Sequence, residues 1–353
     1  MQVLSVVGAR PQFVKISPVD QALKEAGHSH FIVHTGQHYE ASMSDVFFDE
    51  LAIPSPNINM AVGSSSHGQQ TAEMLTGLET IINEVSPSTV IVYGDTNSTL
   101  AATLAAVKLQ TPVVHVEAGL RSFNRVMPEE VNRVLTDHAS DLLLAPTEIA
   151  MKNLSAEGLQ KRSRFVGDVM LDVFEKVKSS IIDLQTPSEM LERDDDFVLA
   201  TIHRQENTSD KNRLRSIIDA LAHIPAPVTL AVHPRLRDIA EKEGINLTTG
   251  SIHCTEPLGY VDLIATLLKA RAVVTDSGGL QKEAFFAETP CVTVRSETEW
   301  LETLSDGWNV LAEPADIVSA IGRPKPLRRD LEPFGTGNAG KAVVAAIESG
   351  FLD

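Results

Sequence analysis

Short apolar runs alternate with longer stretches of helical period along the first half of the chain. The runs have the length and composition of parallel strands that are buried on both faces. They are residues 3–7, 31–34, 89–93, 112–117, 142–145 and 164–166. Alternation of strands with helices is typical of a Rossmann-like α/β domain, and we predict one over residues 1–167.

The second half repeats this pattern after a polar, acidic stretch at 186–196, which is predicted to be a surface loop. Its apolar runs are residues 197–202, 228–232, 252–255, 272–275 and 291–295. We therefore predict a second Rossmann-like domain over residues 168–335. The last segment, 336–353, contains an amphipathic run at 340–349 that is predicted to be a helix packed back on the first domain.

Charged side chains follow the first-half strands at the carboxyl edge of the predicted sheet, where open α/β sheets bind ligands. The cations are Arg10 and Lys15, and the acids are Asp95, Glu117 and one of the pair Glu129 and Glu130. Taken alone, Asp95 can be explained as the cap of the next helix. Glu129 or Glu130 can be explained as an acid that complements the dipole of its own helix. Three acids facing one crevice nevertheless suggest proton transfer.

A strand, a glycine turn and a helix are predicted at residues 272–287. The glycines let backbone N–H groups approach a ligand and the helix N-terminus adds its dipole, so this element favours a phosphate. Ser277 is placed to cap the helix or to donate to a phosphate oxygen, and Glu283 to accept from ribose hydroxyls. An ordinary βα turn explains the stretch equally well. The sequence has no P-loop motif, and the stretch 272–287 has no G-x-G-x-x-G motif, so the predicted ligand is a nucleotide diphosphate held there without either.

Composition narrows the classes of partner. The chain has 353 residues, 43% of them hydrophobic, and a formal net charge of −17, which argues against nucleic acid and anionic membranes. An anionic ligand therefore requires a local cluster of Arg and Lys. Cys254 and Cys291 lie in strand-like runs and are predicted to be small buried residues, as expected in a reducing cytoplasm. No apolar run reaches membrane-spanning length, and His28 and His30 lack further ligands at metal-site spacing.

An ordered set of motifs extends over nearly the whole chain. They are GARPQFVK, HTGQH, GDTNSTLA, HVEAGLRS, MPEEVNR, HRQEN, HPR and DSGGLQKEA. Together they resemble the non-hydrolysing UDP-N-acetylglucosamine 2-epimerase family. The resemblance implies two Rossmann-like domains facing a cleft, the architecture of B-type glycosyltransferases, and a homodimer. It also implies interconversion of UDP-GlcNAc and UDP-ManNAc, by elimination of UDP to a 2-acetamidoglucal and re-addition, with no cofactor and no metal.

The same resemblance implies roles for individual residues. Arg10, Lys15, Ser277, Gly278 and Gly279 would hold the UDP diphosphate, Glu283 the ribose, and His203 the diphosphate or leaving group. Asp95, Glu117 and Glu130 would form the acid–base set around the sugar. Three alternative functions are a hydrolysing relative that releases ManNAc and UDP, a glycosyltransferase of this fold, and a UDP-sugar sensor without catalytic activity. Three acids beyond the phosphate site count against the sensor.

One segment departs from the family pattern. The common Thr-Glu-Arg-Pro-Glu is replaced here by residues 298–302, Thr-Glu-Trp-Leu-Glu. This version resembles relatives that act on UDP-2,3-diacetamido-2,3-dideoxyglucuronic acid. Trp300 would then shape the sugar pocket, or it only packs the loop. A C6 carboxylate on such a sugar needs a cation, for which the candidates are Arg121, Arg125 and Arg204.

Overall fold

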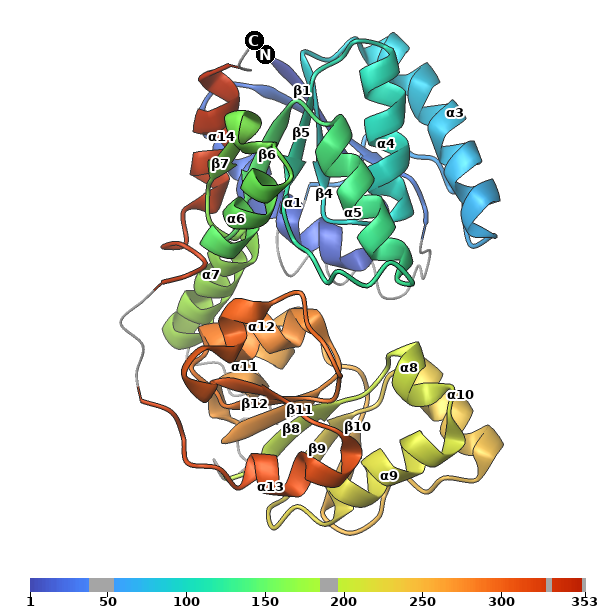
Figure 1. The fold of residues 1–353 in the computed structure, drawn as a ribbon, viewed down its shortest axis with the longest axis vertical. Helices are drawn as coiled ribbons and strands as arrows, with labels where there is room; N and C mark the ends of the chain where they lie inside the picture. Colours follow the sequence, from blue (N-terminus) through green and yellow to red (C-terminus); the bar gives the residue numbers. More distant parts are fainter. Residues whose placement is uncertain (38–53, 185–195, 328–331, 351–353) are drawn as a thin grey trace. The chain divides into compact units, whose positions relative to one another are not determined.

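The computed structural model describes residues 1–37, 54–184, 196–327 and 332–350. The chain forms two compact units, which Figure 1 shows in full. One unit comprises Met1–Glu175 and Glu332–Asp353, and the other comprises Lys176–Leu331. Most of the predicted surface loop at 186–196 lies outside the described residues. No helix in the described parts is both long and apolar enough to cross a membrane.

The first unit is built on a parallel sheet in the order β3-β2-β1-β4-β5-β6-β7. Its strands are β1 Gln2–Val7, β2 Ser29–His34, β3 Ile58–Asn59, β4 Thr89–Tyr93, β5 Val113–Val116, β6 Leu142–Ala145 and β7 Ser163–Phe165. The central strands β1 and β4 are buried on both faces, which explains why they read as nearly continuous apolar runs.

Helices connect the strands of this unit. They are α1 Arg10–Glu25, α3 His67–Val85, α4 Asn97–Lys108, α5 Pro128–Ala139 and α6 Glu148–Ala156, with a 3-10 turn, η1, at Gln160–Arg162. After β7, helix α7 Val169–Leu184 begins in this unit and ends in the second. Helices α3, α4 and α5 lie side by side (Figure 1), and α4 is buried along most of its length. The alanines at 101, 102, 105 and 106 of α4 allow its neighbours to pack closely.

The C-terminal helix α14, Ala339–Glu348, packs against α1 of the first unit. A Cβ added at Gly340 would lie 2.5 Å from the carbonyl oxygen of Pro18, so the two backbones touch where only glycine fits. Asp172 of α7 accepts hydrogen bonds from the N–H groups of Ala339 and Gly340, at 2.9 and 2.8 Å. Burial raises the pKa of Asp172, against the lowering effect of these two donors.

The second unit is built on a parallel sheet in the order β10-β9-β8-β11-β12-β13. Its strands are β8 Val198–Thr201, β9 Val228–Ala231, β10 Ile252–Thr255, β11 Ala272–Thr275, β12 Cys291–Thr293 and β13 Asn309–Leu311. Its helices are α8 Gln205–Thr208, α9 Lys211–Ala222, α10 Pro234–Glu243, α11 Tyr260–Lys269, α12 Gly278–Phe286 and α13 Ile317–Ile321, with 3-10 turns η3 Leu301–Gly307 and η4 Pro314–Asp316. Counted within the unit, this is the Rossmann strand order 3-2-1-4-5-6.

The burial of the two cysteines was predicted correctly for only one of them. Cys291 is buried in β12, where burial raises the pKa of its thiol to about 12. Cys254 is exposed because β10 is an edge strand of its sheet. The preceding residue, His253, is exposed as well. An apolar run therefore identified the strand β10 but not the exposure of its side chains.

Candidate active site

In both sheets the strand order reverses beside the first strand of the unit. In the first unit this switch point lies between β1 and β4, and in the second between β8 and β11. Ligands of open α/β sheets bind at the carboxyl ends of the strands at such points. The predicted site residues that follow β1, β4, β8 and β11 therefore lie at the edges where ligands are expected.

In the first unit Lys15 and Glu117 form a buried ion pair between Nζ and Oε2. Glu117 follows β5 with φ of 73°, a left-handed conformation that is uncommon for residues other than glycine. Gly94, after β4, also has a positive φ, of 62°. A Cβ added there would lie 3.2 Å from Oε2 of Glu117 and 3.4 Å from Nζ of Lys15, so a glycine at 94 makes room for the pair. Non-glycine residues with a strained backbone, such as Glu117, occur most often at functional sites.

The other two predicted acids share one arginine. Arg133 of α5 contacts Oδ2 of Asp95 through Nη2 at 2.5 Å and Oε2 of Glu130 through Nη1 at 3.2 Å. The side chain of Asp95 is 28% exposed, compared with 4% for Glu130 and 6% for Glu117. Asp95 is therefore the most accessible of the three carboxylates. Arg133 itself was not singled out in the sequence, where it reads as an ordinary charge on a helix.

Glu130 also fixes the loop before its own helix. Its carboxylate accepts hydrogen bonds from N and Oγ of Ser122 and from N of Phe123, each at 2.9 Å. Together with Arg133, these donors occupy both oxygens. This arrangement gives Glu130 a structural task that a simple dipole-complementing acid would not have.

A buried network supports this edge of the sheet. His115 of β5 contacts Oδ1 of Asp137 through Nδ1 and the carbonyl oxygen of Gly94 through Nε2, both at 2.7 Å. Asp137 also accepts from Nη1 of Arg121 at 2.7 Å and from N of Gly119 at 3.1 Å. Burial alone would raise the pKa of Asp137, but the contacts with His115 and Arg121 hold it below its usual value. The network holds the turn that carries Gly94.

Arg121, one of the candidates for a sugar carboxylate, belongs to this network. Its Nε and Nη2 each donate to Glu157 at 2.7 Å, and its Nη1 donates to Asp137 and to the carbonyl of Leu120. The side chain is almost completely buried. These contacts favour a structural role for Arg121 over contact with a sugar. Arg125 is exposed in the loop that follows.

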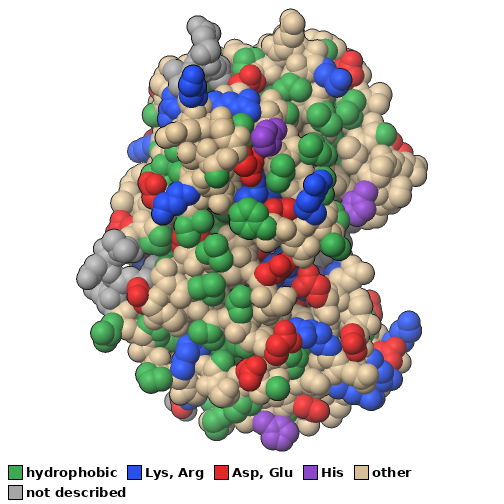
Figure 2. Space-filling view, in the orientation of Figure 1, with side chains coloured by type: hydrophobic (Ala, Val, Ile, Leu, Met, Phe, Trp, Pro, Cys, Tyr) green, Lys and Arg blue, Asp and Glu red, His purple; other side chains and the backbone are tan. Residues whose placement is uncertain are grey.

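Arg10, the remaining predicted cation of this unit, is the first residue of α1, and its side chain lies outside the described part of the structure. On the face that Figure 2 shows, acidic and basic side chains are interspersed, so cations for an anionic ligand have to be found locally. No group of three or more potential metal-ligating side chains occurs among residues 1–37, 54–184, 196–327 and 332–350.

In the second unit a buried aspartate organises the switch point. Asp276, directly after β11, accepts from the N–H groups of His203 and Arg204, at 3.1 and 2.9 Å, and from Nδ2 of Asn207 at 3.0 Å. The ring of His203 stacks on that of His233 with centroids 5.4 Å apart, and its Nδ1 is 3.5 Å from Oδ1 of Asp276. Asp276 thus ties the loop after β8 to the turn after β11.

The predicted strand, glycine turn and helix are present at residues 272–286. Ser277 is the N-cap of α12 and accepts from N of Leu280 at 3.4 Å. Gly278 opens the helix, Gly279 is exposed, and Glu283 is buried one turn further along. This geometry leaves the positive end of α12 at the carboxyl edge of the sheet, as a phosphate site requires.

Comparison with known proteins decides the family. A sequence model described as UDP-N-acetylglucosamine 2-epimerase matches residues 21–348. The chain belongs to this epimerase family. It is 45% identical to the UDP-2,3-diacetamido-2,3-dideoxy-D-glucuronate 2-epimerase of Pseudomonas aeruginosa, over 97% of this chain and 98% of that protein. A UDP-N-acetylglucosamine 2-epimerase homolog of Methanococcus maripaludis is 44% identical, over 99% of this chain and 100% of its own length.

The fold of this epimerase-family chain matches a solved relative along its length. The crystal structure of the Methanocaldococcus jannaschii UDP-GlcNAc 2-epimerase in complex with UDP-GlcNAc and UDP has a TM-score of 0.90 at 36% identity. The match covers 99% of this chain and 100% of that one. The predicted family and the predicted fold class of two Rossmann-like domains are therefore confirmed.

The segment in which this epimerase departs from the family pattern packs closely on α12. Trp300 is buried, and Nζ of Lys282 lies 3.7 Å from the centroid of its ring. The indole Nε1 is 3.4 Å from the position that a Cβ on Gly278 would take. Lys282 and Arg295 are buried cations near this turn that the sequence analysis did not single out. The available signals were the place of Lys282 in the helix that follows the two glycines and the place of Arg295 at the end of the apolar run 291–295.

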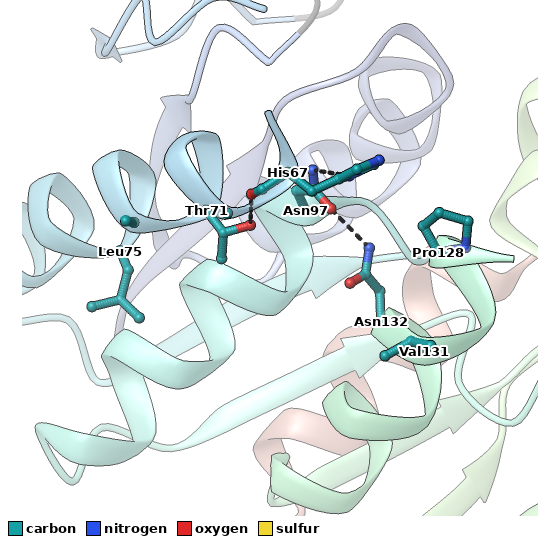
Figure 3. A pocket seen from close by; sticks show the side chains of 9 residues that line it. His67, Thr71, Leu75, Asn97, Pro128, Val131 and Asn132 are labelled. Carbon is teal, nitrogen blue, oxygen red and sulfur yellow. Dashed lines mark hydrogen bonds between the residues drawn. The ribbon is translucent and has the colours of Figure 1, made fainter. Parts of the chain in front are cut away.

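A cavity of about 510 Å³ opens between α3, the start of α4 and the first turn of α5 (Figure 3). Asn97 donates from Nδ2 to Nδ1 of His67 at 3.1 Å, and Asn132 donates to Oδ1 of Asn97 at 3.2 Å and to the carbonyl of Asp95 at 3.0 Å. Leu75 and Val131 add apolar surface. The cavity therefore adjoins the turn that carries Asp95, and the sequence did not predict it.

Proposed function

We propose that this chain catalyses C2 epimerisation of UDP-N-acetylglucosamine, with UDP-N-acetylmannosamine as the product. The observation that carries the proposal is the pairing of Glu117 with Lys15, beside Asp95 with Arg133, at the switch point of the first unit. Two carboxylates there are each held by a cation. A binding site for a phosphate needs cations but no such pair of acids, whereas proton transfer needs positioned acids.

The reaction follows from the chemistry of the sugar. A carboxylate removes the C2 proton, the electrons of the C2–H bond form the C1–C2 double bond, and UDP leaves with the electrons of the C1–O bond. The product of this step is a 2-acetamidoglucal. UDP adds back to C1 after a proton is returned to the opposite face of C2. Because the proton leaves one face and returns to the other, two acid–base groups are required, and we assign Asp95 and Glu117 to these steps.

Glu130 has a different part in this proposal. Its carboxylate holds Arg133, which in turn contacts Asp95. It also fixes the backbone of Ser122 and Phe123. The sequence predicted Glu130 as a member of the acid–base set. We propose instead that it positions Asp95 through Arg133.

The second unit would hold the nucleotide. The diphosphate would lie at the N-terminus of α12, on the N–H groups of Gly278 and Gly279 and the hydroxyl of Ser277. Glu283 would accept from the ribose hydroxyls, and His203 would face the leaving phosphate, where its position is fixed by Asp276. The C2 proton is barely acidic because it is not beside a carbonyl group. The enzyme must therefore lower the barrier mainly by stabilising the negative charge that develops on the departing diphosphate.

A second candidate substrate is UDP-2,3-diacetamido-2,3-dideoxyglucuronic acid. The 45% identity with the Pseudomonas aeruginosa enzyme that is named for this sugar supports it, together with Trp300 in place of arginine. Arg125 and Arg204 remain the candidate partners of the C6 carboxylate, because Arg125 is exposed, the side chain of Arg204 is 26% exposed at the start of α8, and Arg121 is buried. We further propose a homodimer, as the resemblance implies, and a cytoplasmic location, which the two predicted non-disulfide cysteines favour. Light scattering of the purified protein tests the dimer.

Incubation of the enzyme with each UDP-sugar in D2O, followed by NMR of the sugar, tests the proposal. We expect deuterium at C2 while the sugar stays linked to UDP. Stoichiometric release of free sugar and UDP would show a hydrolysing enzyme instead. No incorporation with either sugar would support a sensor, and a comparison of kcat/KM decides between the two substrates.

A further inference from the structure

Several positive groups surround one carboxylate at the first turn of α12. Oε2 of Glu299 lies 3.0 Å from Nη2 of Arg295. Its Oε1 lies 2.8 Å from the position that a Cβ on Gly278, the first residue of α12, would take. Glu299 therefore faces a guanidinium and the positive end of a helix dipole. Lys282, over the ring of Trp300, adds a further cation nearby.

Arg295 carries more hydrogen-bond donors than its surroundings accept. Its side chain is 2% exposed, and within the described residues its Nε and Nη1 have no hydrogen-bond partner. A guanidinium presents five N–H groups in a fixed fork, which suits an anion with several oxygens. Buried donors without acceptors are unfavourable and rare in folded proteins. One carboxylate does not satisfy this site.

We propose that Arg295 binds a phosphate oxygen of the UDP moiety and that Glu299 occupies this position as an internal anion until the ligand displaces it. This inference rests on the proposed function, which supplies UDP as the ligand. A diphosphate brings more negative charge and more acceptor oxygens than Glu299, so it can engage Nε and Nη1 of Arg295 as well as the N-terminus of α12. Arg295 thereby becomes a binding residue that the motifs of the family did not indicate.

The internal anion has a consequence for affinity. Glu299 must leave the N-terminus of α12 when the diphosphate arrives, because two anions at one site repel each other. Binding of UDP is therefore weakened by the free energy that holds Glu299 in place. Removal of the negative charge at 299 should strengthen UDP binding, whereas removal of the positive charge at 295 should weaken it.

Calorimetric titration of the full-length protein with UDP, and with uridine as a probe that lacks phosphate, tests both statements. Arg295→Gln should raise the Kd for UDP by about 10- to 100-fold, the range for a charge-assisted hydrogen bond, and leave the Kd for uridine unchanged. Glu299→Gln should lower the Kd for UDP by about threefold or more. Glu241→Gln, which removes the same charge from an exposed position on α10, is the matched control and should change neither Kd.

Two results would overturn the inference. An unchanged Kd for UDP in Arg295→Gln would make Arg295 and Glu299 a structural ion pair, and a raised Kd in Glu299→Gln would make Glu299 a ligand contact. If Arg295→Gln does not fold, Arg295→Lys keeps the charge, removes the fork of donors, and should still weaken UDP binding and not uridine binding. A wild-type protein that does not bind UDP would refute the proposed function itself. A wild type that binds and epimerises while Arg295→Gln binds equally well would refute only the role of Arg295.

Discussion

The ammonium of Lys15 and the carboxylate of Glu117 meet in a buried ion pair although 102 residues separate them in the sequence. Lys15 comes from α1 and Glu117 from the residue after β5, and Gly94 after β4 leaves room for both. Three connections of the sheet thus contribute to one contact at its carboxyl edge. The pair balances the charge of a carboxylate that the proposed reaction needs, and the first predictions concern it.

Glu117→Gln should lower kcat by on the order of 100-fold or more, because the amide cannot accept the C2 proton. The Kd for UDP should stay within a factor of a few, because the proposed role of Glu117 is proton transfer at C2 of the sugar and not contact with the diphosphate. Turnover measured by NMR and calorimetry with UDP separate the two effects. Near wild-type kcat in this variant would remove Glu117 from the acid–base pair.

Gly94→Ala should disturb the same pair. The new methyl group would lie 3.2 Å from Oε2 of Glu117 and 3.4 Å from Nζ of Lys15, and the residue would keep a φ of 62°. The backbone strain alone costs about 1–2 kcal/mol of stability. Gly158→Ala is the matched control, since its φ is 78° and nothing lies within 4 Å of its added Cβ.

Urea denaturation and kcat of both glycine variants distinguish strain from crowding. We expect a comparable loss of stability from strain in both, and a loss of kcat of about tenfold or more only in Gly94→Ala, because small displacements of catalytic groups are costly. Equal kcat values in the two variants would mean that the space at Gly94 is unimportant for activity.

Glu130→Gln tests whether this acid only complements the dipole of α5. Loss of its charge weakens the contact with Arg133 and the anchoring of Ser122, so we expect a loss of about 2 kcal/mol in the free energy of unfolding and a lower kcat. Glu129→Gln changes an exposed acid of the same helical turn and should stay within about 0.5 kcal/mol of wild type. Identical behaviour of the two variants would contradict the positioning role.

The network of His115, Asp137 and Arg121 should make stability depend on acid pH. The pKa of Asp137 in the folded protein lies below its ordinary value of about 4, so its contribution is present above that value and is lost as pH falls through the folded-state pKa. Asp137→Asn leaves Arg121 and His115 with a neutral partner and should cost about 3–5 kcal/mol at pH 7. Denaturant unfolding at pH 7, 5 and 3.5 should show a smaller difference between variant and wild type at the lowest pH. A constant difference would refute this linkage.

The sequence predicted the parts of the site that follow directly from the apolar runs. Asp95, Glu117 and Ser277 stand one or two residues after the ends of strands, so their place at a sheet edge required only the strand assignment. The pairing of Arg133 with Asp95, and the burial of Arg295, depend on tertiary packing that leaves no periodic signal in the chain. The short strand β13 and the exposure of Cys254 were likewise decided by position within the sheet.

The last prediction concerns Trp300 and the choice of sugar. The ring lies under the ammonium of Lys282 and beside the first turn of α12, so its replacement should alter the loop that borders the phosphate turn. Trp300→Phe keeps a ring for the cation and should lose about 1 kcal/mol or less from this contact, with additional loss from the smaller volume.

Trp300→Arg restores the residue that is common in the family but places a second cation against buried Lys282, and we expect it to be the less stable of the two variants. If Trp300 shapes the sugar pocket, the ratio of kcat/KM for the diacetamido uronic sugar to that for UDP-N-acetylglucosamine should fall in both variants. Steady-state kinetics with the two UDP-sugars measures this ratio, and Leu301→Ala, at an exposed neighbouring side chain, is the control that should preserve it. Loss of stability with an unchanged ratio would mean that Trp300 serves only to pack the loop against α12, and the choice of sugar would then have to be made elsewhere.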